Sequence, residues 1–199
     1  MSEFIKKWKD KLDELEEKLN LQSHQVAESF EAQKAKMTSQ LSDKIQSLKD
    51  TKLDEQTAGL KAKMEALQVQ LALGKAESKD AFEAQKKELD HAVHEAKVQL
   101  EASQKQLGDG YQGVMKELGE QLESFQTHLD VFKLQFHLGK ADLTEEWDNK
   151  KKKVQQELHS LKQKAGENQH AASEKWEEFS DEMQESFGHF QKALKKLFS

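Results

Sequence analysis

The chain has 199 residues, of which 34% are charged and 35% hydrophobic, and its formal net charge is −6. It contains no cysteine, which excludes disulfide bonds and thiol catalysis, and no proline. A proline inside a helix removes a hydrogen bond and clashes with the preceding turn, so its absence favours long uninterrupted helices. The modest acidic balance argues against nucleic acid as a partner, because a nucleic-acid interface needs a clustered basic face.

An apolar stripe with an eleven-residue period runs along the first fifty residues. Its members step by 4, 4 and 3 residues, a period of about 3.67 residues per turn that favours straight or slightly right-handed supercoiled helices. Only Ser23 and Lys34 interrupt its apolar character. The stripe consists of Phe4, Trp8, Leu12, Leu15, Leu19, Ser23, Val26, Phe30, Lys34, Met37, Leu41, Ile45 and Leu48.

Three segments are expected to end helices. The phase of the stripe slips near residues 50–51, where we expect a turn. The segment 107–113, LGDGYQG, concentrates three glycines and an aspartate, which is a strong turn signal. The segment 164–169, KAGENQ, offers Gly166 as a helix C-cap.

Two further glycines, Gly74 and Gly139, could also end a helix. The apolar stripe keeps its phase across both, however, and the equivalent place in the first part of the chain has no glycine, so we expect continuous helices there. The prediction is an all-α fold, an elongated antiparallel helical bundle or coiled coil of about four long helices. These helices are expected at 2–49, 53–107, 111–165 and 169–198.

An internal repeat organises the chain. Residues 70–134 and 135–199 match without gaps at an offset of 65, and the match is mainly one of apolar positions, as in "LALGKAE" and "FHLGKAD". Residues 1–69 read as a shortened copy. A repeated hydrophobic face specifies an architecture and names no chemistry, so we predict a single elongated helical domain over 1–199.

Two Glu-x-x-His pairs are the only hint of a metal site, since helical bundles can hold di-metal centres built from such pairs. They are Glu88 with His91 and Glu167 with His170. Helical phase places both histidines about 200° from the core stripe, on the solvent side. We therefore expect no metal, no cofactor and no catalytic residue, although a metal-carboxylate bundle enzyme remains a distant alternative.

Both ends of the chain combine aromatic residues with lysines on amphipathic helices, a pattern that interfacial membrane segments use. The same positions are also terminal copies of the repeated stripe, so a bundle core explains them without lipid. Core burial is the preferred interpretation, and an interface or lipid-facing surface is the alternative. The residues concerned are Phe4, Trp8, Leu12, Phe187, Phe190, Leu194 and Phe198.

The eleven-residue amphipathic stripe resembles that of exchangeable apolipoproteins. In composition and pattern the chain is more similar to small, hydrophilic, all-helical bacterial coiled-coil proteins of the stress-response type. That resemblance implies a structural or interaction protein that binds other proteins. The absence of cysteine favours a cytoplasmic location, and the absence of a nucleophile or phosphate-loop motif favours a non-enzymatic role. The expected partners of the protein are a second copy of itself or another helical protein, and the alternative is reversible binding to a membrane, lipid or granule surface.

Overall fold

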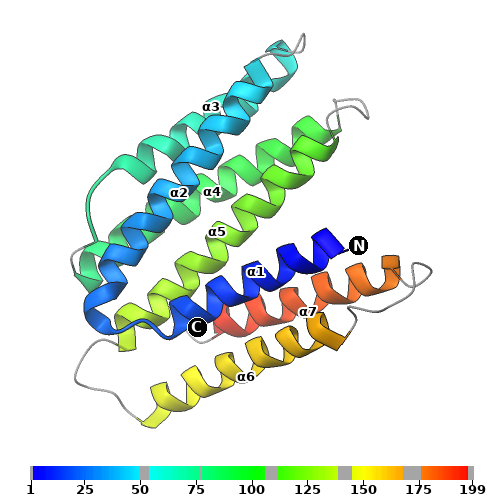
Figure 1. Ribbon diagram of the computed structural model, residues 1–199. Helices are drawn as coiled ribbons and strands as arrows, with labels where there is room; N and C mark the ends of the chain where they lie inside the picture. Colours follow the sequence, from blue (N-terminus) through cyan, green and yellow to red (C-terminus); the bar gives the residue numbers. More distant parts are fainter. Residues whose placement is uncertain are drawn as a thin grey trace. The chain divides into compact units, whose positions relative to one another are not determined.

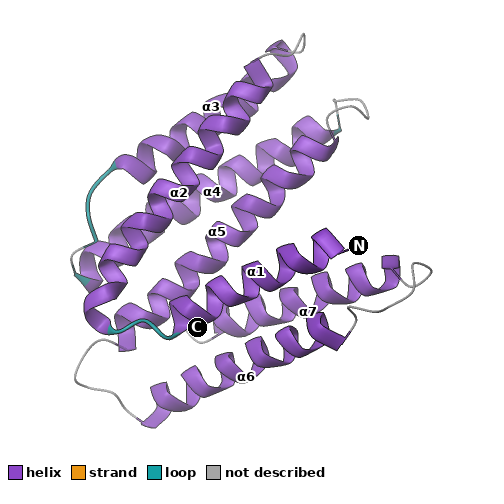
Figure 2. Ribbon diagram, viewed as in Figure 1, coloured by secondary structure: helices purple, strands orange, loops and turns teal. Residues whose placement is uncertain are grey.

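The computed structural model describes residues 2–49, 54–76, 78–105, 112–138, 145–167 and 176–196. These residues form helices and their connections, with no strand among them (Figures 1 and 2). The described part of the chain therefore confirms the all-α class. Its helices are α1 (Ser2–Leu19), α2 (Ser23–Lys49), α3 (Asp54–Ala72), α4 (Lys79–Gln104), α5 (Gln112–Leu138), α6 (Glu145–Glu167) and α7 (Trp176–Lys196).

The predicted stripe forms the core. From Leu12 to Leu48 the described members of the stripe are almost completely buried, and so are the corresponding positions of the later helices. Lys34, which interrupts the apolar pattern, is buried as well, with 3% of its surface exposed. Burial of these side chains supplies most of the favourable free energy of folding, at about 25 cal/mol per Å² of apolar surface.

The helices group into two compact units. One unit comprises residues 24–129, with α2, α3, α4 and most of α5. Within it, neighbouring helices run antiparallel: Gln68 of α3 donates to Ser42 Oγ of α2 at 2.8 Å, and Lys63 of α3 pairs with Glu95 of α4 at 2.7 Å. Lys44 of α2 likewise reaches Glu117 of α5.

The other unit comprises residues 1–23 and 130–199, with α1, α6, α7 and the end of α5. Here α6 runs antiparallel to α1, because Gln155 donates to Asn20 at 3.1 Å whereas Lys162, two turns further along α6, pairs with Asp13 at 2.6 Å. The core of this unit joins residues from both ends of the chain. The predicted single domain over 1–199 stays a prediction.

The predicted continuity of the long helices is wrong at two places. The helix expected over 2–49 ends at Leu19 and resumes at Ser23, and the helix expected over 53–107 ends at Ala72 and resumes at Lys79. At the first break Asn20 N donates back to the Glu16 and Glu17 carbonyls, while Gln135 Nε2 donates to the Leu19 carbonyl at 2.6 Å. A side chain from α5 thus satisfies a carbonyl group that a continuous helix would have used internally.

At the second break Gly74 adopts the left-handed conformation, with φ +64°. This conformation ends helices and strongly favours glycine. After the turn, Ser78 caps α4 by accepting a hydrogen bond from Ala81 N at 3.2 Å. The chain reverses direction at this break, and α3 and α4 each turn their apolar face toward the same core. The spacing of the apolar residues in the sequence therefore does not reveal the break.

Most of the other predicted helix ends cannot be compared with the structure. The turn near residues 50–51, most of the segment 107–113 and Gly139 lie outside the described residues. Gly166 is not the C-cap that the sequence predicts, since α6 continues through it to Glu167. No helix in the described ranges is long and apolar enough to cross a membrane.

The Gly74 turn provides a stability test. An added Cβ at Gly74 would lie 2.3 Å from Gln85 Nε2 and would meet a positive φ. We expect Gly74→Ala to destabilise the protein by about 1–2 kcal/mol. Gly188→Ala is the matched control, because Gly188 lies inside α7 with open space around it; this change should stabilise the protein by about 0.5–1 kcal/mol. Urea denaturation followed by far-UV circular dichroism measures both, and an unchanged midpoint for Gly74→Ala would contradict the role of the turn.

Candidate functional site

The residues expected at an interface or lipid surface lie mainly inside the unit formed by α1, α6, α7 and the end of α5. Leu12, Phe187, Phe190 and Leu194 are each at most 2% exposed, and Trp8 packs against the same core while remaining partly buried. The side chain of Phe4, and all of Phe198, lie outside the description. In this folded state the described members form a core or pack against it. That they serve as an interface or lipid-facing surface stays a prediction.

An aromatic cluster joins the two terminal helices. The rings of Trp8 and Phe187 meet edge to face with centroids 5.2 Å apart, and Phe190 lies 6.0 Å from Phe187. Lys11 Nζ lies 3.8 Å from the centre of the Phe187 ring and 4.8 Å from that of Trp8. A cation over ring faces is attracted by their quadrupoles, so Lys11 strengthens the contact that holds α1 to α7.

An ion bridge fastens α1 to α6 in the same unit. Lys162 of α6 reaches both Asp13, at 2.6 Å, and Glu16 of α1. Hydrogen bonds to Asp13 and then Glu16 raise the pKa of Lys162 above the usual lysine value, despite a small opposing effect of burial. Because the folded-state pKa is raised, the stabilisation is present at neutral pH and disappears only as the pH rises past the lysine range. Asp13 and Glu16 remain about half exposed and Lys162 is partly buried, so solvent screening keeps the contribution modest.

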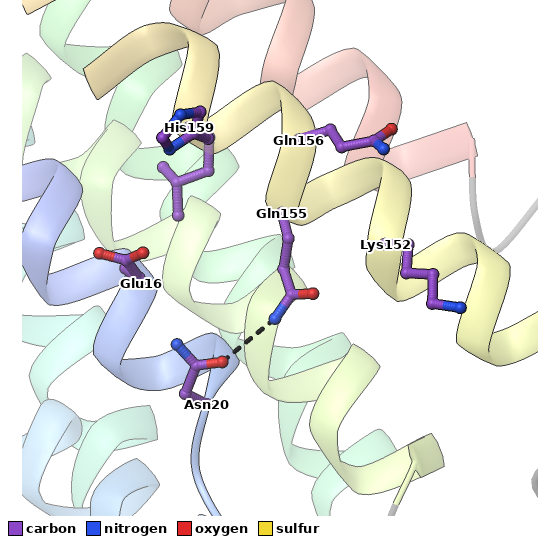
Figure 3. A pocket seen from close by; sticks show the side chains of 7 residues that line it. Glu16, Asn20, Lys152, Gln155, Gln156 and His159 are labelled. Carbon is purple, nitrogen blue, oxygen red and sulfur yellow. Dashed lines mark hydrogen bonds between the residues drawn. The ribbon is translucent and has the colours of Figure 1, made fainter. Parts of the chain in front are cut away.

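A shallow polar groove lies beside this bridge, between α1 and α6 (Figure 3). Glu16 and Asn20 line it from α1, and Gln155 crosses it to donate to Asn20. Its other lining residues, from α6, are Lys152, Gln156, Leu158 and His159. The polar side chains among them are exposed or half-buried, so the groove lacks the buried, converging polar groups that orient a small ligand.

A second polar arrangement lies in the other unit, around the turn between α3 and α4. Lys34 Nζ donates to the Gly74 carbonyl at 3.0 Å and pairs with Glu31 at 3.1 Å. Glu31 in turn accepts from Ala76 N at 3.3 Å. Gln85 Nε2 donates to the Leu73 carbonyl at 2.8 Å. We call the three side chains Glu31, Lys34 and Gln85 the turn cap.

The charges of the turn cap stabilise the end of α3. The C-terminal end of α3 exposes carbonyl groups and carries a partial negative charge, which favours a nearby cation. Lys34 supplies that cation at a position where only 4% of its side chain is exposed. Glu31 compensates the buried charge, and the aromatic pair Phe30–Phe82, with ring centroids 5.0 Å apart, packs beneath. Cation, carboxylate and amide are all engaged in holding the turn.

Sequence analysis missed the turn cap, although the chain contains a signal for it. Residues 30–34 and 82–86 both read FEAQK. Both copies bring their residues to the same turn: Glu31 and Lys34 from the first, Gln85 from the second. The second lysine, Lys86, is also buried and pairs with Asp90 at 2.6 Å. The repeated pentapeptide, with a lysine at a core position in each copy, was thus a signal that Lys34 and Lys86 have a structural role.

The histidines do not assemble a metal site in the described residues. No group of three or more potential ligands converges there. His91 is exposed, as its helical phase predicts, and His170 lies outside the description. His128 is buried instead, with Nδ1 2.8 Å from the Ser124 carbonyl and 3.4 Å from Gln33 Nε2.

Comparisons with models of known protein families, with curated proteins and with solved structures find no match.

Lys34 is the residue on which the turn cap depends most directly. We expect Lys34→Met to destabilise the protein by about 1–3 kcal/mol, because the change leaves the Gly74 carbonyl and Glu31 without their buried cation. Lys36→Met is the control, since Lys36 is exposed on the same helix. Hydrogen exchange should show lost protection at the α3–α4 turn in the first variant only. Equal stability of the two variants would show that Lys34 is dispensable.

Proposed function

We propose that this protein is a non-enzymatic helical scaffold, which acts through non-covalent contacts of its helix surfaces and associates with copies of itself. One observation carries the proposal: several polar side chains of the two described units end or join helices, and two of them, Lys34 and Gln135, are buried. Lys34 and Gln85 cap one turn, and Gln135 caps the end of α1.

The pattern of the sequence supports the same proposal. A repeat that preserves apolar positions while its polar positions change is expected of a packing face. The finer architecture, one elongated antiparallel bundle built on 65-residue repeats, belongs to this proposal. So do a cytoplasmic location, which the absence of cysteine favours, and a helical protein as an alternative partner for the amphipathic helices. A role under stress belongs to it as well, and follows from the resemblance to bacterial coiled-coil proteins.

Sedimentation velocity over a wide range of protein concentrations tests self-association. We expect the sedimentation coefficient to rise with concentration, because a reversible assembly follows mass action. Raising the salt concentration should not abolish association, since apolar contacts are strengthened rather than screened by excluded salts. A single monomeric species at every concentration would refute the proposed self-association.

A second candidate function, reversible binding to a lipid surface, has one observation in its favour. Helix α1 buries Leu12, Leu15 and Leu19 on one side while Lys6 and Lys7 stay exposed near its start. An amphipathic helix with basic residues beside an apolar face can lie in a membrane interface. Binding would require α1 to leave the core of its unit, because its apolar face is covered in the folded state.

Co-sedimentation with vesicles tests this second function. If α1 binds lipid, vesicles containing anionic lipid should retain the protein and purely zwitterionic vesicles should not. Lys6→Glu should weaken retention at least fivefold, since each basic residue near an anionic surface contributes about 1 kcal/mol. Lys105→Glu, an exposed site of the other unit, is the matched control. Absence of retention by anionic vesicles would exclude lipid binding.

A further inference from the structure

Three large apolar side chains are well exposed in the described residues, and two of them share one helix face. Val69 is 57% and Leu73 is 53% exposed, at the end of α3 and directly after it. The third, Val98 on α4, is 51% exposed. Single exposed apolar residues are ordinary on protein surfaces, but a continuous row of them on one helix often marks an interface.

Helix α3 carries such a row. At about 100° per residue, four apolar residues of the helix lie within about 40° of a single line along it, and a fifth follows directly after the helix end. They are Ala58, Ala62, Ala66, Val69 and Leu73, and all five are exposed. We call this row the outer stripe of α3. The buried stripe lies on the opposite side and consists of Thr57, Leu60, Met64, Leu67 and Leu71.

The outer stripe is not needed to fold the unit that contains it. The buried stripe packs α3 into that unit, while Lys63 and Gln68 tie the flanks of α3 to α4 and α2. A surface helix of this kind ordinarily turns polar residues outward. Helix α3 instead presents apolar residues on two opposite sides, and on the outer side the size of these residues changes regularly along the helix.

Residue size along the outer stripe is graded, and the gradient makes the stripe self-complementary. Small alanines occupy the N-terminal part, and the larger Val69 and Leu73 occupy the C-terminal part. If two copies of α3 pack antiparallel about a two-fold axis between positions 65 and 66, Ala58 meets Leu73 and Ala62 meets Val69 of the second copy. Ala58 and Ala62 then each oppose a larger residue, and Ala66 lies beside the axis, whereas a parallel pair would oppose alanine to alanine.

The charges beside the stripe suit the same pairing. Between residues 57 and 73 the charged residues are Lys61, Lys63 and Glu65, a positive balance in a chain of net charge −6. Lys61 and Glu65 lie on one edge of the stripe. In the antiparallel pair, Lys61 of the second copy lies about 7–8 Å along the axis from Glu65, within reach of two long side chains. Each Glu65 is thus placed between the lysine of its own helix and that of the other copy.

We propose that the outer stripe of α3 is the surface through which two copies of this chain associate, with the two α3 helices antiparallel about a two-fold axis. This inference rests on the proposed self-association and names its surface. One helix face is smaller than the roughly 800 Å² that each partner buries in a stable complex, so the dimer is weak and concentration-dependent.

Two lysine substitutions provide the first test. Val69→Lys places a charge between the paired stripes, opposite Ala62 of the second copy, and should raise the dimer dissociation constant at least tenfold in sedimentation equilibrium. Val98→Lys introduces the same charge at a similarly exposed valine of α4 that is not part of the stripe, and should change the constant less than twofold. Far-UV circular dichroism should be unchanged in both variants, because neither side chain belongs to the core.

Cysteine substitutions test the geometry, since the natural chain has no cysteine. Ala66→Cys lies beside the two-fold axis, so a short bis-maleimide should join two copies of this variant. Ala58→Cys lies about 22 Å along the axis from its counterpart and should not be joined. Equal cross-linking of both variants would overturn the antiparallel arrangement. A dimer that survives Val69→Lys unchanged would overturn the surface alone, whereas the absence of any dimer in the natural protein would refute self-association itself.

Discussion

A buried cation holds together the turn that allows the helices of residues 24–129 to pack. The apolar stripe can be covered only if the chain reverses, and each reversal leaves helix-end carbonyl groups that must find partners. Lys34 meets this need from another helix by donating to the Gly74 carbonyl, and Glu31 balances its charge while accepting from Ala76 N. Gly74 supplies the left-handed backbone of the reversal.

Polar side chains also stabilise helix ends in the unit formed by residues 1–23 and 130–199. Gln135 donates to the last carbonyl of α1, and Lys162 fastens α1 to α6 through two carboxylates. Aromatic contacts between Trp8 and Phe187 close the core around the ends of the chain. In both units, polar side chains at helix boundaries are engaged in packing, which favours a protein that works through surfaces. The outer stripe of α3 is the surface that packing leaves apolar.

The apolar stripe was predictable because burial follows helical periodicity directly. Leu12, Phe30 and Leu48, spread along the first two helices, are buried as their spacing requires, and His91 is exposed for the same reason. The helix end at Ala72 was not predictable from phase, because the antiparallel reversal from α3 to α4 can keep the apolar face in step. The helix end at Leu19 was not predictable either, because the apolar residues keep their spacing along the sequence across it. Phase alone therefore cannot distinguish a continuous helix from a hairpin whose two arms share a core.

The sequence by itself determined the helical class and which face of each helix is buried, since both depend on local propensity and on spacing along one helix. It also contained the repeated FEAQK segment, but the contribution of this segment to the α3–α4 turn could be recognised only in the fold. Tertiary structure alone decided that Lys34 caps a turn forty residues away and that Gln135 caps a helix more than a hundred residues before it. Such contacts join atoms that are distant in the chain, and the spacing of residue types along the sequence does not show which distant residues meet in the fold.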